Sequence, residues 1–523
     1  MAQNNDYVVL SVRILYFCVI SFGLLLAAIT FHGFSPVLDP VAPVTFLDRI
    51  SYWMGVHEKS SIVVVELGNL SFIRVEANIK STAFENVFSG AWSTLVFTYV
   101  FHRHLSDGTF HIEKEYRSRI LPGLFSDQVT SNATFMQLQI EEILNRASDN
   151  IPGSNFRLRL RPDDCHSEEC LPPLLVKISN EALTLDEKKV QLVVQTLTKR
   201  LENNTDFYFN PEKSLGALRN LADETALQWF AINLLSHSFK DWRVSTSAII
   251  LDVGEQDTFI TMAVAAGKPL PDQRVWTVRQ LTAFGHDIKL VTFRYPGLGL
   301  YSARSHVFQL SSTTGVLSSR DGTSGVDVRS ACVNPVCDAF WHWTNTTYHV
   351  RGVVNGTYEL VRERNGPFAG KRINRPVAKY DYCHRVCAAY VGEKLRVKFE
   401  EKDADGKADK AIFDSLRTSS SNHRKVFMAG LLREKSIERG LTLPDSAGGN
   451  VKMRSFLDSL KHACKVPNTE QPFACLDLMF LATLVDQLLG FKQGSILHSA
   501  SNVNGMTAEW PIAVAFYVYQ NGL

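Results

Sequence analysis

The stretch 249–260, IILDVGEQDTFI, has the residue order of a strand that runs into an anion-binding turn. Its apolar residues lead into Asp252-Val-Gly, and a strand that ends in this way can present backbone N–H groups to an anion. Glu255 and Asp257 then bring two acids to the same turn. Carboxylates oppose phosphate binding, because like unit charges about 4 Å apart repel by roughly 4 kcal/mol at an effective dielectric constant near 20.

A second acid that could do chemistry is Glu224, in the stretch 221–235, LADETALQWFAINLL. The apolar spacing of this stretch predicts a helix, and Glu224 stands in its first turn. A carboxylate there can act as a general base if it lies about 3 Å from a water molecule. The alternative is an ordinary exposed acid at the start of a helix.

These residues need a scaffold, and 523 residues are enough for two or more domains. A hydrophobic content of 45% and a charged content of 21% are typical of a globular protein. The formal net charge of +2 gives no reason to expect a nucleic-acid partner. From residue 61, strand-like runs and helix-like stretches alternate in two rounds, which predicts an α/β protein with two lobes.

The N-terminal segment 14–31, ILYFCVISFGLLLAAITF, carries no charge. At 1.5 Å per residue, about 18 residues cover most of a bilayer core of roughly 30 Å. Arg13 precedes this segment and no charge follows before Asp39, so a short cytosolic tail (1–13), a membrane anchor and a lumenal stem (32–60) are predicted. A cleaved signal peptide is the alternative, and it would also export the rest of the chain.

Eight cysteines follow the apolar segment, and an even number suits disulfides in an oxidising lumen. A zinc site is disfavoured, because only one cysteine pair has finger-type spacing. Five Asn-x-Ser/Thr sequons agree with a lumenal location. The cysteines are Cys165, Cys170, Cys332, Cys337, Cys383, Cys387, Cys464 and Cys475, and the sequon asparagines are Asn69, Asn132, Asn203, Asn345 and Asn355.

Four segments resemble the apyrase family, the nucleoside triphosphate diphosphohydrolases, and most closely its nucleoside diphosphatase branch of the endoplasmic reticulum and Golgi. The helix of Glu224 is similar to the family's G-x-x-E-G-x-x-x-W-I-x-x-N-x-L. The others are 284–307 (Y-x-L-Y-x-x-S-x-L-G-x-G-L-x-x-A-R), 472–491 (C-x-D-L-x-Y-I) and 502–517 (N-x-x-E-x-x-W-A-L-G-A). The match is collinear from about residue 60 to the end.

The resemblance implies an actin-like fold of two RNase H-like lobes around a cleft, in the actin/hexokinase-like superfamily, preceded here by one transmembrane helix. Residues 61–240 would form lobe I with the first phosphate loop and the general-base helix. Residues 241–490 would form lobe II with the second phosphate loop, and 491–523 would return to lobe I. A nucleotide would bind in the interlobe cleft with Ca²⁺ or Mg²⁺.

The second phosphate loop of the family, D-L-G-G-A-S-T-Q, falls on residues 252–259. The resemblance gives Asp252 to the metal, Gly254 and Thr258 to phosphate, and the general base to Glu224. The second Gly of the motif is Glu255 here, and its Ser is Asp257.

The first phosphate loop, D-A-G-S-x-G-T-R, aligns best with residues 88–95, which keep only Gly90 and Thr94 as phosphate-binding residues. A rival frame places Glu66 and Gly68 in the D-x-G positions. Both loops lose a glycine, the first loop also loses its arginine, and acid or bulk is gained.

Family bridges are expected at Cys464–Cys475 and Cys332–Cys383, which would leave Cys337 with Cys387 and Cys165 with Cys170. Local pairs within 332–337 and 383–387 are the alternative.

The functional hypothesis is a type II membrane protein of the Golgi or endoplasmic reticulum lumen, with the cell surface also open. Its family reaction, metal-dependent hydrolysis of the terminal phosphate of nucleoside di- and triphosphates, is predicted to be impaired by the degenerate loops. The alternative is an active nucleoside diphosphatase that removes the diphosphate released by glycosyltransferases.

Overall fold

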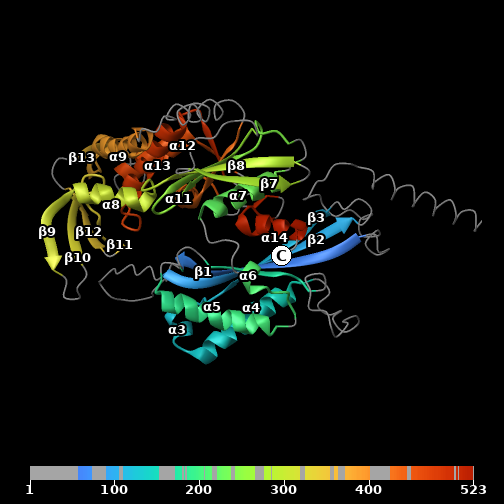
Figure 1. Cartoon of the computed structure of the whole chain (residues 1–523). Helices are drawn as coiled ribbons and strands as arrows, with labels where there is room; N and C mark the ends of the chain where they lie inside the picture. The colour runs from blue at the N-terminus through green and yellow to red at the C-terminus, as the bar shows by residue number, and fades with distance from the viewer. Residues whose placement is uncertain are drawn as a thin grey trace, which may run out of the picture. The chain divides into compact units, whose positions relative to one another are not determined.

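A computed structural model gives the architecture of the chain between residues 57 and 521 (Figure 1). Within the described part, no helix combines the length and the apolar character needed to cross a membrane. The predicted anchor 14–31, residues 32–56 of the predicted stem, Cys165, Cys170, Asn345 and Asn355 lie outside the described residues. Residues 57–60, the end of the predicted stem, instead belong to the first strand of the fold. The range 57–521 is described except for 73–89, 105–109, 152–170, 179–181, 183–184, 205, 215–220, 237–238, 240–241, 266–275, 284–285, 319–323, 345, 354–357, 363–371, 401–423, 444–448, 500–501 and 504–505.

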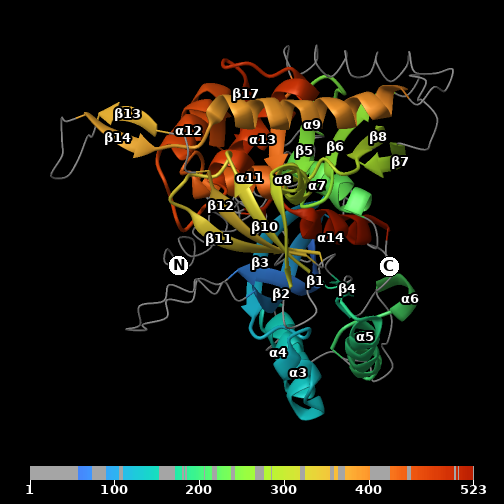
Figure 2. The same ribbon diagram turned by 90° about the vertical axis from the view of Figure 1, so that its left-hand side faces the viewer.

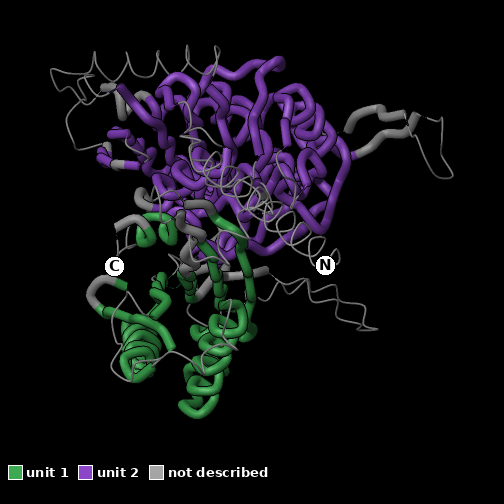
Figure 3. Tube along the Cα trace, turned by 90° about the vertical axis from the view of Figure 1, so that its right-hand side faces the viewer, with its two compact units in different colours: residues 1–73, 90–219, 514–523 green, residues 74–89, 220–513 purple. Residues whose placement is uncertain are grey.

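The chain divides into two compact units (Figure 3). Unit 1 holds residues 1–73, 90–219 and 514–523, and unit 2 holds 74–89 and 220–513. Each unit contains sheets and helices, so the expected mixed α/β fold is confirmed. The helix that carries Glu224 groups with unit 2, whereas the sequence placed it in the first lobe, because it packs on strands of the unit 2 sheet.

Unit 1 is built on a four-stranded sheet in the order β3-β2-β1-β4, with helices on both of its faces (Figure 1). Val65 of β1, Val96 of β2 and Val176 of β4 pack with α4 and α5 in one core. Phe101, on the other face of β2, stacks on Tyr519 of α14 at 4.5 Å. The elements are β1 (His57–Phe72), β2 (Gly90–His104), β3 (Phe110–Ile120), β4 (Leu174–Ile178), α3 (Asp127–Thr130), α4 (Ala133–Asp149), α5 (Glu187–Glu202), α6 (Pro211–Ser214) and α14 (Trp510–Asn521), of which residues 510–513 group with unit 2.

Two of the sequon asparagines cap helices of unit 1. Asn132 Oδ1 accepts a hydrogen bond from the N–H of Phe135 at the start of α4, and Asn203 donates to the Lys199 carbonyl at the end of α5. Both side chains are exposed. Asn69 lies within β1.

Unit 2 is built on a seven-stranded sheet in the order β16-β17-β15-β5-β6-β8-β7. Residues alternate between its two faces. Leu251 and Ile260 enter the main core with α13, whereas Thr261 on the other face bonds to Thr225 of α7. The strands are β5 (Ile249–Val253), β6 (Thr258–Val264), β7 (Trp276–Ala283), β8 (His286–Tyr295), β15 (Val426–Ala429), β16 (Gly449–Lys452) and β17 (Ile496–Ser499).

The remaining elements of unit 2 are helices, a smaller four-stranded sheet and two two-stranded sheets (Figure 2). A smaller sheet in the order β11-β12-β10-β9 packs its Val328, Tyr348 and Val350 into the same core. The elements are α7 (Leu221–Leu235), α8 (Leu300–Leu310), α9 (Tyr380–Glu400), α11 (Gly430–Glu438), α12 (Met453–Lys465), α13 (Ala474–Leu489), β9 (Ser312–Ser318), β10 (Ser324–Ser330), β11 (Asp338–Trp343), β12 (Thr346–Gly352), β13 (Tyr358–Arg362), β14 (Arg372–Pro376), β18 (Asn502–Val503) and β19 (Met506–Thr507).

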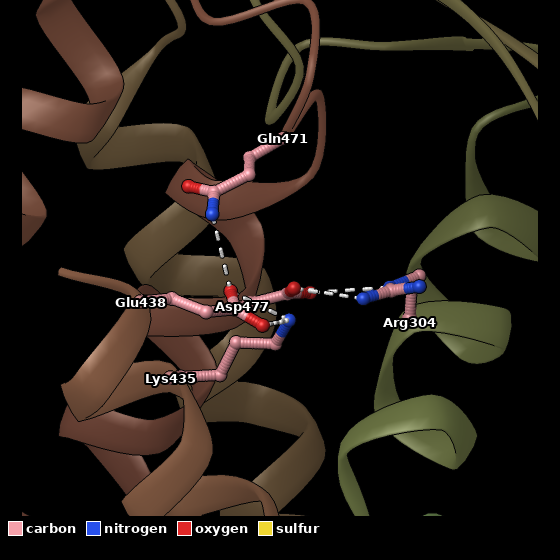
Figure 4. Close-up of polar contacts among 5 residues, drawn as sticks. All are labelled: Arg304, Lys435, Glu438, Gln471 and Asp477. Atoms are coloured by element: carbon pink, nitrogen blue, oxygen red, sulfur yellow. Dashed lines mark hydrogen bonds and ion pairs between the residues drawn. The ribbon is translucent and has the colours of Figure 1, made fainter. Parts of the chain in front are cut away.

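A buried ion pair joins α8 to α13 (Figure 4). Arg304 donates through Nε and Nη2 to the two carboxylate oxygens of Asp477, at 3.1 and 2.7 Å. The two side chains are only 7% and 4% exposed. The guanidinium also lies 4.8–4.9 Å from the ring centres of Tyr301, Trp341 and Phe473. A buried charge is tolerated when it is paired in this way, so each partner depends on the other.

A looser polar group lies beside this pair. Lys435 Nζ pairs with Glu438 at 2.8 Å, and Gln471 donates to the same carboxylate at 3.4 Å (Figure 4). These contacts join α11 to the segment before α13.

Two of the expected disulfides are present in unit 2. Cys464 bonds to Cys475, and Cys332 bonds to Cys383 across 51 residues. The expected Cys337–Cys387 bridge is wrong, since both residues are buried free thiols. The local alternative fails too, because Cys332 is bonded to Cys383 rather than to Cys337. Cys337 instead directs its thiol to the Asn468 carbonyl at 3.8 Å, and burial raises the pKa of Cys387 to about 12.

We expect Asp477→Ala to lower the free energy of unfolding by about 3–5 kcal/mol, because it leaves the Arg304 charge buried without its partner. Chemical denaturation measures this change. Asp486→Ala is the matched control on the same helix, since its half-exposed ion pair with Lys492 predicts a loss below about 1 kcal/mol. Equal losses in the two variants would contradict the role given to the buried pair.

Alkylation without reduction should label Cys337 and Cys387 only after the protein is unfolded, because both thiols are buried. Non-reducing peptide mapping of the same samples should recover linked 332–383 and 464–475 peptides. A linked 337–387 peptide in native protein would refute this assignment.

Candidate functional site

Asp252 stands at the end of β5, at the centre of the seven-stranded sheet. It is paired with Phe259 of β6 on one side and with Ala429 of β15 on the other. Gly430, the next residue after β15, has a left-handed φ of 55°. A side chain at this position would collide with Asp252 Oδ1, so a glycine is required for the helix α11 to begin beside the carboxylate.

Two further carboxylates act on Asp252 from neighbouring helices. Burial raises the pKa of Asp252 to about 7, and the negative charges of Glu224 on α7 and Glu434 on α11 add to this shift. The structure therefore brings Glu224 and Asp252, both predicted from the sequence, into one electrostatic environment. Glu434 was missed. Its only signal in the sequence is its position one helical turn after the glycine that ends the strand VFMA.

The position of Glu224 is set by contacts further along α7. Trp229 donates its indole N–H to the Ala248 carbonyl at 2.8 Å, and Asn233 accepts the Ala248 N–H at 3.0 Å. Thr225, which stands where the family motif has glycine, bonds to Thr261 at 3.0 Å. Helix α7 is thus attached both to the residue before β5 and to the middle of β6.

The residues around Asp252 fit a divalent cation that is held mainly by water and ligand oxygens. The available donors are carboxylate oxygens, which hard cations prefer. Among the described residues, no group of three or more His, Cys, Asp or Glu side chains is close enough to hold a metal ion. Mg²⁺ is often bound by one or two carboxylates together with water and phosphate oxygens. Asp252, whose ionisation is disfavoured without a nearby positive charge, would be the protein ligand.

The loop 254–257 gives its carbonyl oxygens to the start of α8. The Gly254 carbonyl accepts from Leu300 N–H at 3.0 Å, and the Gln256 carbonyl accepts from Gly299 N–H at 2.7 Å. The Glu255 carbonyl accepts from the N–H groups of residues 301 and 302, at 2.9 and 3.1 Å. A side chain at Gly299 would collide with the backbone of residues 255 and 256, so this close approach requires glycine.

The direction of these carbonyls fixes the direction of the loop's N–H groups. In a planar trans peptide, the C=O of one residue points opposite to the N–H of the next. Since the carbonyls of residues 254, 255 and 256 all point to α8, the N–H groups of residues 255, 256 and 257 point away from it. Successive N–H groups that point the same way form an anion-binding concavity. The N–H groups of residues 255–257 are thus oriented in one common direction, as an anion-binding concavity requires.

The two acidic side chains of the loop have different surroundings. Glu255 is exposed. Asp257 is buried: its Oδ2 accepts from Nε and Nη2 of Arg294 at 2.8 and 2.6 Å, and its Oδ1 accepts the Gly297 N–H at 2.8 Å. Its charge is therefore compensated by an arginine that contacts it directly. Only Glu255 presents an acid to solvent from this loop.

The other predicted residues of the two loops lie as follows. Gly254 donates its N–H to the Asp257 carbonyl at 2.9 Å, and buried Thr258 donates its hydroxyl to the Leu298 carbonyl at 2.7 Å. Gly90 is the first residue of β2. Thr94 is buried opposite the core residue Leu67, so its side chain lies on the core face of the unit 1 sheet.

Glu66, the acid of the rival frame, is a buried residue of β1. It lies opposite Leu95 of β2, and its Oε1 is 3.9 Å from Nζ of the buried Lys177 on β4. Residues of both frames therefore lie on one pair of strands, β1 and β2. They belong to unit 1, whereas Glu224 and Asp252 belong to unit 2.

Comparison with known proteins supports the resemblance seen in the sequence. Ectonucleoside triphosphate diphosphohydrolase 6 of Mus musculus is 23% identical over 435 residues, 82% of this chain and 80% of its own. Ectonucleoside triphosphate diphosphohydrolase 5 of Mus musculus is 23% identical over 85% of this chain and 90% of its own. A nucleoside diphosphate phosphatase of Homo sapiens is 23% identical over 83% and 86%.

No protein-family model matches the chain. A solved structure of nucleoside triphosphate hydrolases from Neospora caninum aligns with a TM-score of 0.47 and 12% identity, over 91% of this chain and 97% of its own. The similarity to curated relatives extends over more than four fifths of the chain, and the resemblance to the nucleoside triphosphate diphosphohydrolases is confirmed.

The raised pKa of Asp252 predicts a pH-dependent stability in the absence of metal. Folded Asp252 keeps its proton up to about pH 7, whereas the unfolded chain releases it near pH 4. The folded state binds more protons in this window, so the free energy of unfolding should fall as pH rises from about 4 to about 7. Thermal unfolding in EDTA should show this decline relative to Asp252→Asn. Asp287→Asn, at an exposed position, is the control and should keep the pH dependence of the parent. If Asp252→Asn and the parent had parallel pH profiles, the raised pKa assigned to Asp252 would be contradicted.

Proposed function

We propose that this relative of the nucleoside triphosphate diphosphohydrolases binds nucleoside di- and triphosphates with a divalent cation and hydrolyses their terminal phosphate slowly. The observation that carries the proposal is the row of N–H groups from residues 255–257, directed away from α8 at the end of the strand that holds Asp252. Backbone donors do not depend on side-chain type, so they persist although the glycine and serine of the family loop are replaced.

Each carboxylate of the site has a distinct role in this proposal. Asp252 would hold the cation, and the cation would supply positive charge to the phosphate oxygens. Glu224, on the helix attached to β5 and β6, accepts a proton from the attacking water. Glu434 adds negative charge, which favours cation binding near Asp252. The N–H groups of the loop orient the phosphate, and phosphoryl transfer depends mainly on such positioning and charge neutralisation.

The reaction is slow because Glu255 stays exposed beside the phosphate-binding N–H groups. A like charge about 4 Å from a phosphate oxygen costs roughly 4 kcal/mol at an effective dielectric constant near 20. That repulsion corresponds to about three decades in affinity. The proposal further places the protein in the Golgi or endoplasmic reticulum lumen, anchored by residues 14–31. The lumenal part would consist of two RNase H-like lobes.

A fully active nucleoside diphosphatase is the second candidate. The contact between Asp257 and Arg294 favours it, because it compensates one of the two acids that argue against phosphate binding.

The test is phosphate release from UDP, GDP and ATP with Ca²⁺ or Mg²⁺, beside Glu224→Gln. We expect slow turnover that requires the cation and falls at least about a hundredfold in the variant, because general-base catalysis contributes about 10²–10⁴. Turnover equal to that of Glu224→Gln would refute hydrolysis.

Glu255→Gly separates the two candidates in the same assay. If Glu255 slows the parent, the variant should raise kcat/KM by about tenfold or more. If the parent is a fully active diphosphatase, the substitution should change kcat/KM little.

A further inference from the structure

The Asp257–Arg294 ion pair joins a buried carboxylate to an exposed guanidinium. The Asp257 side chain is only 9% exposed, whereas the Arg294 side chain is 59% exposed. The carboxylate holds the guanidinium through Nε and Nη2 on a single oxygen, while its other oxygen is held by Gly297 N–H. The aspartate is thus fixed within the turn, and it orients an arginine that faces solvent.

Arg294 lies on the same face of the sheet as Asp252. The pairing of β5 with β6 places Asp252 opposite Phe259, and the pairing of β6 with β8 places Phe259 opposite Arg294. Paired residues point to one face, and adjacent strands are about 4.8 Å apart, so the two backbones are separated by roughly 10 Å. This is also the face on which Thr225 of α7 bonds to Thr261.

The family motifs that the chain resembles have serine at both positions of the pair. The second phosphate loop, D-L-G-G-A-S-T-Q, places its Ser at Asp257. The segment Y-x-L-Y-x-x-S-x-L-G-x-G-L-x-x-A-R, aligned on Gly297 and Gly299, places its Ser at Arg294. The chain has therefore replaced two small hydroxyl residues, 37 positions apart, with an acid and a base that contact each other.

The chemistry of the pair suits a phosphate group. Arginine carries five N–H donors in a fixed plane, and it can donate to a carboxylate and to a phosphate through different edges. A carboxylate that fixes one edge reduces the side-chain entropy lost when the other edge binds. The arginine also restores positive charge on a face that holds Asp252 and Glu224.

We propose that Arg294 contacts the terminal phosphate of the bound nucleotide and that Asp257 is its positioning residue. This inference rests on the proposed function, because it concerns the same phosphate. In this arrangement Asp257 favours phosphate binding, because it positions Arg294, although its own charge would repel phosphate.

A double-mutant cycle in a Glu224→Gln background tests the inference without relying on turnover. Calorimetry measures the affinity for whichever of UDP, GDP and ATP binds the parent most tightly, with Ca²⁺ present. The variants are Arg294→Ser, Arg294→Lys, Asp257→Ser and the double Asp257→Ser/Arg294→Ser. Arg279→Ser, which removes an exposed arginine of the neighbouring strand β7, is the matched control. Thermal midpoints show that each variant is folded at the temperature of the measurement.

We expect Arg294→Ser to weaken nucleotide binding about tenfold to a hundredfold, the range for one hydrogen bond to a charged group. Arg294→Lys should recover part of the loss, and Arg279→Ser should bind like the parent. Asp257→Ser should weaken binding as well, and the double variant should bind no more weakly than Arg294→Ser, because Asp257 acts through Arg294. Affinity for the matching nucleoside, which lacks phosphate, should not change.

Two results would overturn the inference while the proposed function stands. One is a folded Arg294→Ser variant with parental nucleotide affinity. The other is an Asp257→Ser variant that binds more tightly than the parent, which would show that the carboxylate only repels phosphate. A parent that binds none of the three nucleotides would instead overturn the proposed function, and the inference with it.

Discussion

The first N–H groups of helix α8 have no carbonyl partners within the helix, and this constraint organises the site. Every α-helix begins with such unsatisfied donors. In this chain, the carbonyls of residues 254–256 satisfy them, which sets the orientation of three successive peptide planes. Gly299 makes the approach possible, because any side chain there would collide with the loop backbone. The direction of the loop's N–H groups is therefore set by a helix on the opposite side of the loop.

The constraint holds only if α8 itself is fixed, and the Arg304–Asp477 pair fixes it. Both charges are buried, and three aromatic rings surround the guanidinium. On the other face of the sheet, Trp229 and Asn233 attach α7 to Ala248, the residue before β5. The segments that resemble the family most strongly are thus the ones that hold the two sides of the loop in place. Residues in these segments fix the helices α7 and α8, which position the loop.

Much of this arrangement could be predicted from the sequence, because it depends on local patterns. The apolar spacing of 221–235 predicted α7, and the apolar run before Asp252 predicted β5. The Cys332–Cys383 and Cys464–Cys475 bridges came from the family resemblance. The roles of Asp257 and Glu434 could not be predicted in this way. Asp257 finds its partner 37 residues away across a strand pairing, and Glu434 approaches Asp252 only because Gly430 lets a helix start beside it. Long-range pairing of this kind leaves no periodic signal in a single sequence.

A loop defined by the orientation of its main-chain N–H groups also affects how the relatives of such a protein can be recognised. Side chains in the loop can drift to glutamate or aspartate while the peptide planes keep their orientation, so the motif that defines a family can fade before the geometry does. Alignments spread over most of the chain still find its relatives at 23% identity. Distant members of such a family are better sought through the helices and buried ion pairs that brace the loop than through the loop itself.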